Sequence, residues 1–297
     1  AVVIAGANCS EFEDEIANLG LPVFAEPSSG VRHLANSILS YRFKLAEKHQ
    51  LVSQIDQLVV YGKPTLSRPV IALLRSGVEV IVRPSRMGNF EIPSERKLIN
   101  EAILSSSDSA WLNSWLEEDV IPETSKELDR ASIVRMAWDI GQPEVIVLGA
   151  SQMIREADHY APRRNLKVWA NRGLAGIDGT IATATGIALH ANRVRAILGD
   201  LTFLHDVGSL VIDPADGALN LQLILVNDHG GKIFKYLEVA KTVSAEVYDR
   251  VFRTGQNFAT EDLARAFGWQ YVLVSNQEDY ASALEMSGRV IIEIVLD

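Results

Sequence analysis

Two short polar sequences, each at the end of an apolar run, carry oxygen ligands suited to a hard cation. Gly199-Asp200 follows the run Arg195–Leu198, and Asn227-Asp228 follows Leu221–Val226, 28 residues further along the chain. The carboxyl ends of parallel strands meet at one edge of a sheet, where α/β proteins place their ligands. Mg²⁺ takes oxygen ligands and often keeps phosphate oxygens as partners. The spacing therefore predicts a cation and phosphate site with Asp200 and Asp228 as metal ligands.

Glycines accompany both pairs. Gly199 allows the backbone to approach a phosphate closely, and Gly230 and Gly231 open a loop whose N–H groups can face an anion. Taken singly, Gly-Asp and Asn-Asp are also ordinary punctuation between a strand and a turn. The two pairs together, with the glycines and this spacing, favour the functional interpretation.

Composition sets the class of protein. The 297 residues are 47% hydrophobic, which is enough for two modest cores, so we expect two domains. A net charge of −10 argues against extended contacts with nucleic acid. No apolar stretch reaches the roughly 20 residues that span a membrane, and the start lacks a signal-peptide layout. Cys9 is the single cysteine, which excludes an internal disulfide and fits a cytoplasmic protein.

Alternation of β-rich runs and helix-like stretches predicts an α/β fold with parallel sheets. We expect strands at Val2–Ala5, Val23–Ala25, Gln57–Tyr61, Val78–Val82, Glu144–Leu148, Leu166–Ala170, Val194–Leu198, Leu221–Val226, Tyr271–Val274 and Val290–Val295. We expect helices within Gly30–Lys48, Pro69–Arg75, Lys126–Trp138, Thr180–His190, Thr260–Phe267 and Gln277–Met286.

The helix at Pro69 has a recognisable start, with Ser67 as its cap and proline tolerated in the first turn. The pattern loosens between Ser105 and Glu123, where we place a domain boundary. This divides the chain into residues 1–112 and 113–297.

Three longer segments resemble one family of thiamine-diphosphate enzymes, the 2-succinyl-5-enolpyruvyl-6-hydroxy-3-cyclohexene-1-carboxylate (SEPHCHC) synthases of menaquinone biosynthesis. They are Asn171–Gly179, Gly199–Asp206 and Asn227–Phe234, in the family's order, and the clear match covers about residues 145–240. The resemblance implies two Rossmann-like three-layer domains. Residues 1–112 would form the central domain, of the transhydrogenase dIII type, and residues 113–297 the diphosphate-binding domain.

The family uses thiamine diphosphate with Mg²⁺ or Mn²⁺. It decarboxylates 2-oxoglutarate and adds the succinyl unit to isochorismate. By resemblance, the metal ligands are Asp200, Asp228 and the carbonyl of Gly230. The cofactor contacts are Ile177, Gly199, Asp200, Leu201, Thr202, Gly231 and Ile233. Ile177 would lie under the cofactor, and its stiff β-branched side chain suits a rigid wedge, although Ile177 is also a plausible core residue.

Both substrates of the family are dicarboxylates, which arginines bind bidentately. The resemblance carries Ser151, Arg155 and Arg172 over as substrate residues. It carries over Arg68 on a shorter match. It also implies an apolar wall of Ile233, Phe234 and Leu237, where Leu237 equally fits a helix core stripe. Two positions depart from the common pattern. Asp228 stands where many thiamine enzymes have Asn, and its carboxylate adds negative charge beside a diphosphate. His229 also stands where Asn is common.

The family also has an N-terminal domain that binds the aminopyrimidine ring and supplies an activating glutamate. This sequence has no counterpart of it, so we expect no catalytic residue here. The chain would be a C-terminal part, inactive by itself, whose full-length form is a homodimer or homotetramer.

Three alternatives stay open. One is another thiamine-diphosphate 2-oxoacid decarboxylase or an acetolactate-type synthase, for which Arg155 and Arg172 would be unnecessary. A second is a non-catalytic nucleotide-binding α/β protein, although no Gly-x-Gly-x-x-Gly follows a strand. A third is a structural assembly module, against which the polar strand ends argue.

Overall fold

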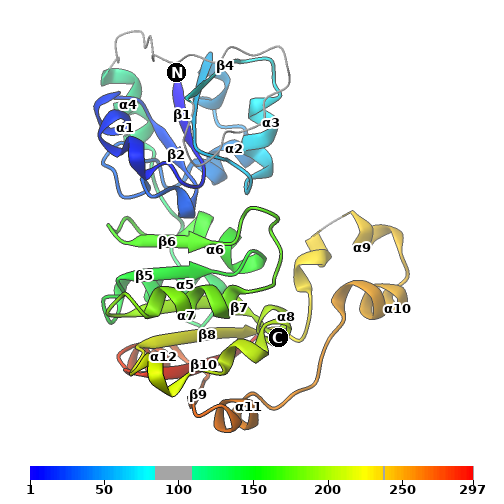
Figure 1. Ribbon diagram of the computed structural model, residues 1–297. Helices are drawn as coiled ribbons and strands as arrows, with labels where there is room; N and C mark the ends of the chain where they lie inside the picture. The colour runs from blue at the N-terminus through cyan, green and yellow to red at the C-terminus, as the bar shows by residue number, and fades with distance from the viewer. Residues whose placement is uncertain (84–108, 237, 297) are drawn as a thin grey trace. The chain divides into compact units, whose positions relative to one another are not determined.

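The computed structural model describes residues 1–83, 109–236 and 238–296 (Figure 1). The chain groups into two compact units. The first comprises Ala1–Glu123 with Arg155–Val168, and the second comprises Thr124–Ile154 with Trp169–Asp297. The division of the sequence into domains 1–112 and 113–297 stays a prediction.

The first unit contains a four-stranded sheet of order β2-β1-β3-β4. Its strands are β1 (Val2–Ala5), β2 (Val23–Ala25), β3 (Gln57–Tyr61) and β4 (Glu79–Arg83). Every neighbouring pair is parallel. All four strands were predicted to within one residue at each end.

Both faces of this sheet are covered, because alternate residues of each strand enter different apolar clusters. Val2 and Ile4 of β1 pack with side chains from α2 (Tyr41–Glu47), α3 (Arg68–Leu74) and α4 (Ser109–Glu117). Val3 and Ala5 instead pack with Ile16 of α1 (Glu13–Asn18). This arrangement confirms the predicted three-layer architecture for the first unit.

Helix α3 begins as predicted. The Ser67 hydroxyl oxygen accepts a hydrogen bond from the backbone N–H of Val70 at 3.4 Å, and Pro69 lies in the first turn. Proline is tolerated there because the first N–H groups of a helix have no partner within the helix.

The prediction of a long helix within Gly30–Lys48 was wrong for its first part, since only α2 is helical. The Asn36 amide donates to the carbonyls of Ile16 and Leu21, and the Ser37 hydroxyl donates to that of Val31. These side-chain bonds hold the segment in turns and compete with helical hydrogen bonding.

Helix α4 lies where we expected a loosened stretch. Trp115 is fully buried on it and packs edge-to-face on Phe24, with ring centroids 5.0 Å apart. The apolar spacing of Trp111 and Trp115 therefore belongs to a helix of the first unit.

The second unit contains a six-stranded sheet of order β6-β5-β7-β8-β10-β9 (Figure 1). The strands are β5 (Val145–Leu148), β6 (Lys167–Ala170), β7 (Val194–Gly199), β8 (Leu221–Asn227), β9 (Gln270–Val274) and β10 (Arg289–Val295). The pairs β5–β7, β7–β8, β8–β10 and β10–β9 are parallel. All six strands were predicted to within one residue.

Helices cover both faces of this sheet as well. On one face, α7 (Thr180–Ala188), α8 (Asp200–His205) and α11 (Thr260–Ala266) share an apolar cluster with β5, β7, β8 and β10. On the other face, the buried side chain of Arg195 on β7 reaches backbone carbonyls of α5 (Arg130–Asp139) and α12 (Gln277–Leu284). Each face of the sheet is therefore shielded from solvent.

The order of the strands creates a crevice. The chain leaves β5 through α6 (Gln152–Tyr160) to β6 on one side, and later returns to place β7 on the other side of β5. Such a switch point separates the loops that follow the two strands, and α/β proteins bind ligands there.

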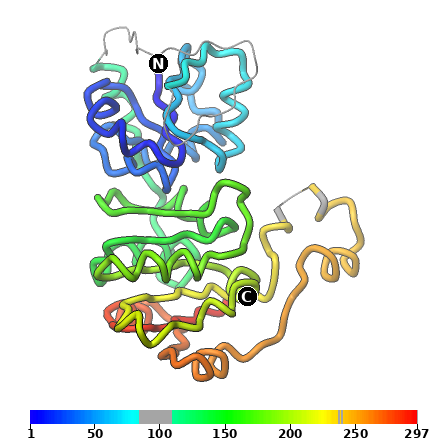
Figure 2. Tube along the Cα trace, in the orientation of Figure 1, coloured from blue at the N-terminus to red at the C-terminus, as the bar shows by residue number. Residues whose placement is uncertain are grey.

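The connection from β8 to α11 extends away from the six-stranded sheet (Figures 1 and 2). It contains the short helices α9 (Val239–Thr242) and α10 (Ala245–Val247), followed by a π-helical stretch at Tyr248–Arg253. In the part of the chain that the structure describes, we find no helix with the length and apolar character needed to cross a membrane.

Candidate functional site

A cavity of about 140 Å³ lies at the carboxyl edge of the six-stranded sheet. Three strand ends supply its lining. Ser151, Gln152 and Met153 follow β5, the segment Gly199–Thr202 follows β7, and residues of the loop 228–234 follow β8. Since β5 and β7 flank the switch point, the cavity lies where the strand order predicts a ligand site.

Asp200 is the more buried of the two carboxylates that line the cavity, with 2% of its surface exposed. Its Oδ1 accepts a hydrogen bond from the Leu201 N–H at 2.9 Å, and its Oδ2 accepts one from the Gly230 N–H at 2.6 Å. Burial raises the pKa of Asp200, the negative charge of Asp228 raises it further, and the two hydrogen bonds oppose that shift. A buried carboxylate beside a second one is a suitable environment for a divalent cation.

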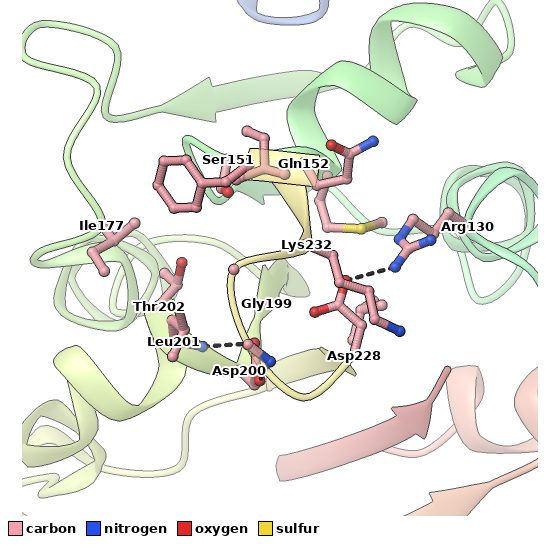
Figure 3. Close-up of a pocket in the computed structure, with 16 residues that line it drawn as sticks. Arg130, Ser151, Gln152, Ile177, Gly199, Asp200, Leu201, Thr202, Asp228 and Lys232 are labelled. Atoms are coloured by element: carbon pink, nitrogen blue, oxygen red, sulfur yellow. Dashed lines mark hydrogen bonds and ion pairs between the residues drawn. The ribbon is translucent and has the colours of Figure 1, made fainter. Parts of the chain in front are cut away.

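Asp228 lies at the end of the neighbouring strand and is 8% exposed. Its Oδ2 accepts a hydrogen bond from Nη2 of Arg130 on α5 at 2.6 Å (Figure 3). Oδ1 has no hydrogen-bond partner within residues 1–83, 109–236 and 238–296, which leaves that oxygen available to a ligand.

The loop after β8 has a backbone that suits glycine. Gly230 has a φ of +123°, and a Cβ atom at this position would overlap the carbonyl oxygen of Arg253. Gly231 donates its N–H to the same carbonyl at 2.6 Å. Both glycines line the cavity, and the loop holds the Gly230 N–H against Asp200.

Gly199 differs from these two glycines. A Cβ there would meet only the carbonyl oxygen of Val226, at 3.9 Å, so the protein itself leaves room for a side chain. Because Gly199 lines the cavity, this open space is available for close approach of a ligand. The space and the adjacent carboxylates fit a metal-bound diphosphate.

Side chains alone do not complete a metal site. Among the described residues, no group of three or more His, Cys, Asp or Glu side chains is placed to hold a metal ion. Asp200 and Asp228 supply two oxygen ligands, so a cation here would take further oxygens from the backbone or from the ligand itself.

The rest of the lining is mainly apolar. Ile177, from the loop before α7, points into this site (Figure 3). Met153 comes from α6, and Ile233 and Phe234 come from the 3₁₀ turn Lys232–Tyr236. These side chains suit the apolar part of a ligand whose charged end lies at Asp200 and Asp228.

Most of the predicted site residues come together in this cavity. Its lining includes Ser151, Ile177, Gly199, Asp200, Leu201, Thr202, Asp228, Gly230, Gly231, Ile233 and Phe234. Their individual roles stay predictions.

The predicted arginines do not line the cavity. Arg155 lies on α6, one turn after Gln152, and Arg172 lies just beyond β6 and is 9% exposed. Arg68 is the first residue of α3 and, like Arg155, belongs to the first unit. Leu237 lies outside the described residues.

Sequence reasoning missed five lining residues: Arg130, Gln152, Met153, Val226 and Lys232. Gln152 and Met153 lie between the predicted residues Ser151 and Arg155, and Lys232 lies within the segment Asn227–Phe234. Arg130 is 98 residues away from Asp228 in the chain, and no local pattern distinguishes it from a surface arginine.

Comparison with known proteins agrees with this geometry. A sequence profile of the family described as thiamine pyrophosphate enzyme, C-terminal TPP binding domain, matches residues 148–293, which contain all of the cavity lining except Arg130. Residues 148–293 therefore belong to the family of thiamine pyrophosphate enzymes and match the domain that is described as binding the cofactor.

Within that class, the chain is similar along nearly its whole length to proteins named 2-succinyl-5-enolpyruvyl-6-hydroxy-3-cyclohexene-1-carboxylate synthase. The relative from Renibacterium salmoninarum is 38% identical, over 99% of this chain and 56% of the relative. Those from Nocardioides sp. and Leifsonia xyli subsp. xyli are 36% and 34% identical, over 99% and 100% of this chain and 60% of each relative. The chain thus spans somewhat more than half the length of these relatives.

Proposed function

We propose that this chain provides the diphosphate-binding half of the active site of a SEPHCHC synthase in menaquinone biosynthesis. The carrying observation is the convergence of Asp200, Asp228 and the Gly230–Gly231 loop on one cavity at the switch point. Asp200, Asp228 and the Gly230 carbonyl would hold Mg²⁺ or Mn²⁺. The metal would in turn bind the diphosphate of thiamine diphosphate.

Bound thiamine diphosphate would supply the electron sink for decarboxylating a 2-oxoacid. The chain's own residues would position it. Gly199, Leu201, Thr202 and Gly231 would hold the diphosphate end, and Ile177 and Ile233 would supply apolar contacts for the rest. The size of the cavity supports a partial site. Its volume is about 140 Å³. Pockets that bury most of a drug-sized ligand have volumes of roughly 300–1,000 Å³.

The substrates would be 2-oxoglutarate and isochorismate, both of which carry carboxylates. Ser151 follows β5, Arg155 lies on the helix after it, and Arg172 follows β6, so all three follow strands at the cofactor edge of the sheet. Two arginines in the segments that follow these strands favour dicarboxylates over the neutral side chains that an acetolactate-type synthase accepts. The apolar side chain of Phe234, which lines the cavity, would add a contact to the substrate.

The chain by itself is expected to bind cofactor without turnover. Among the described residues that line the cavity, the only carboxylates are Asp200 and Asp228, and both are assigned to the metal. A further carboxylate that activates the cofactor would come from the portion of the longer relatives that this chain does not match, within a homodimer or homotetramer.

Isothermal titration of thiamine diphosphate in the presence of Mg²⁺ tests the cofactor site. We expect metal-dependent binding, and we expect Asp200→Ala to weaken it by more than about 10-fold. Removing groups that only hydrogen-bond to metal ligands already costs about 10–100-fold in affinity. Asp178→Ala is the matched control, because the Asp178 side chain is 76% exposed and lies outside the cavity lining. Equal affinity in the wild-type chain and Asp200→Ala would contradict the proposal.

Decarboxylation of 2-oxoglutarate tests the substrate assignment. The chain is assayed alone and with the unmatched N-terminal portion of a relative supplied as a separate polypeptide. We expect turnover only in the second mixture, with Arg172→Met raising KM for 2-oxoglutarate. Turnover of pyruvate in preference to 2-oxoglutarate would instead favour an acetolactate-type activity.

A further inference from the structure

Arg130 is a cationic residue in the cavity that no sequence pattern indicated. Its guanidinium forms an ion pair with Asp228 at 2.6 Å, and the two side chains are 22% and 12% exposed (Figure 3). Asp228 is the only hydrogen-bond partner of the Arg130 side chain in the described part of the molecule, and the Arg130 Nε is buried with no partner there. The exposed fractions show that the pair is partly shielded from solvent.

The backbone of Arg130 is held in place by the start of α5. Asp129 caps the helix by accepting a hydrogen bond from the Ser132 N–H at 2.7 Å, and the Ser132 hydroxyl accepts one from the Asp129 N–H at 2.9 Å. This reciprocal capping box fixes the first turn, in which Arg130 follows the cap. Asp228 is fixed equally well at the end of a central strand.

The pair resolves an electrostatic difficulty of this site. A diphosphate must bind near both Asp200 and Asp228, and like charges repel strongly where water is excluded. An asparagine in place of Asp228 would avoid one of those charges. With Arg130 present, the three side chains together carry one formal negative charge, which is the charge of an aspartate and an asparagine.

We propose that Arg130 is a positioning and charge-compensating residue of the cofactor site, which makes an aspartate at position 228 compatible with a bound diphosphate. Arg130 occupies Oδ2 of Asp228 and leaves Oδ1 to the metal. This inference rests on the proposed binding of thiamine diphosphate and Mg²⁺ at the cavity.

Lys232 is the other cationic side chain of the described lining, and it is placed differently. Its Nζ donates to the carbonyl of Leu296 at 3.4 Å and makes no ion pair with Asp228. Lys232→Gln therefore removes one positive charge from the same cavity without removing the partner of Asp228, which makes it a matched control.

The test is a double-mutant cycle that measures the Kd of thiamine diphosphate at saturating Mg²⁺. We expect Arg130→Gln to weaken binding about tenfold or more, and Arg130→Lys to weaken it less because the charge is kept. Asp228→Asn brings the formal charge of the three side chains from −1 to 0 and keeps an oxygen at position 228, so it should bind no more than about twofold more weakly than wild type. The double variant Arg130→Gln/Asp228→Asn should regain most of the lost affinity.

Thermal unfolding with Mg²⁺ alone gives a second readout. Arg130→Gln leaves two uncompensated carboxylates, so we expect Mg²⁺ to raise its Tm by more than that of wild type. Lys232→Gln should have the same effect on cofactor affinity whether residue 228 is Asp or Asn, because it does not act through Asp228.

The outcomes separate this inference from the proposed function. If Arg130→Gln loses as much affinity in the Asp228→Asn background as in wild type, Arg130 has a structural role or contacts the ligand directly, and charge compensation is wrong. If wild type does not bind the cofactor and Mg²⁺ raises the Tm of Arg130→Gln no more than that of wild type, both proposals fail. If Arg130→Gln does not fold but the double variant does, the rescue supports compensation, whereas unfolding of both variants would overturn it.

Discussion

At the scale of single residues, Gly230 shows how local backbone geometry constrains the site. Its N–H is directed to the buried Asp200 carboxylate, and its φ of +123° lies where side chains are strained. The Arg253 backbone occupies the position that a Cβ would take. The position therefore has two independent reasons to be glycine, and both arise from the loop that contacts Asp200.

We predict that Gly230→Ala lowers the free energy of unfolding by roughly 1–3 kcal/mol or more, because the strained φ and the backbone overlap both act against it. Urea unfolding measures the change. Gly186→Ala is the control of opposite sign: Gly186 lies within α7 with no atom near the added Cβ, so alanine should stabilise by about 0.5–1 kcal/mol. An unchanged stability for Gly230→Ala would contradict this account of the loop.

At the scale of elements, one buried arginine joins two helices to the central strands. Arg195 on β7 is fully buried, and it donates to the carbonyls of Ala137 and Ile140 at the end of α5 and to that of Leu284 at the end of α12. Its Nε donates to the Gln222 side chain on β8 at 2.7 Å. Burial lowers the pKa of Arg195 to about 10. The guanidinium thus satisfies carbonyls that helix ends leave without partners.

We predict that Arg195→Met destabilises the chain by about 3–5 kcal/mol, since it leaves several buried acceptors unsatisfied. Chemical denaturation is the measurement. Arg265→Met, which removes a 70% exposed arginine paired with Glu261 and Asp262, should cost less than about 1 kcal/mol. Similar losses for the two variants would mean that the buried network contributes little.

Helix α6 carries a titratable group that makes stability depend on pH. His159 stacks on Phe43 with ring centroids 5.0 Å apart. Burial, followed by the positive charge of Arg42, lowers its pKa from 6.5 to about 4. The unfolded chain therefore takes up a proton at His159 at a higher pH than the folded chain does. The stability that the neutral imidazole contributes is present above pH 6.5 and is lost as the pH falls towards 4.

We predict that His159→Phe, which keeps an aromatic stack on Phe43, flattens the decline in unfolding free energy between pH 6.5 and about 4. The difference should reach about 1–2 kcal/mol, a value that allows for the partial exposure of His159. His190→Gln alters an exposed histidine and should leave the wild-type slope in place. Parallel pH profiles for wild type and His159→Phe would show that His159 does not carry the effect.

At the scale of the whole molecule, the two units have separate apolar cores. One pair of clusters lies on the two faces of the four-stranded sheet, and another cluster lies on the six-stranded sheet. All residues that line the cofactor cavity belong to the second unit. A ligand that binds in this cavity would therefore stabilise the second unit directly.

We predict that thiamine diphosphate with Mg²⁺, at a hundred times its Kd, raises the free energy of unfolding of the second unit by about 2.7 kcal/mol. Differential scanning calorimetry of the whole chain should then show one transition moving upward while that of the first unit stays in place. Asp200→Ala should abolish the shift. A single transition that moves as a whole would mean that the two units unfold together.

Local sequence determined much of this protein. Alternation of apolar runs and turn residues located all ten strands that the described residues form, because buried parallel strands must be short and apolar. Asp200 and Asp228 were predicted to share one edge because each directly follows such a strand. The motifs from Asn171 to Phe234 also carried the resemblance to thiamine-diphosphate enzymes, which the comparisons confirm.

Only the tertiary structure decided which distant residues meet. The order of the six-stranded sheet places β5 beside β7 and so brings Ser151 to the cavity of Asp200. Arg130 reaches Asp228 across 98 residues, and Arg195 lies buried in a strand whose other residues are apolar or glycine. The turns at residues 31–40 likewise depend on carbonyls of Ile16 and Leu21. Local periodicity reports which face of an element is buried, whereas these contacts depend on the spatial order of the strands, which no single segment encodes.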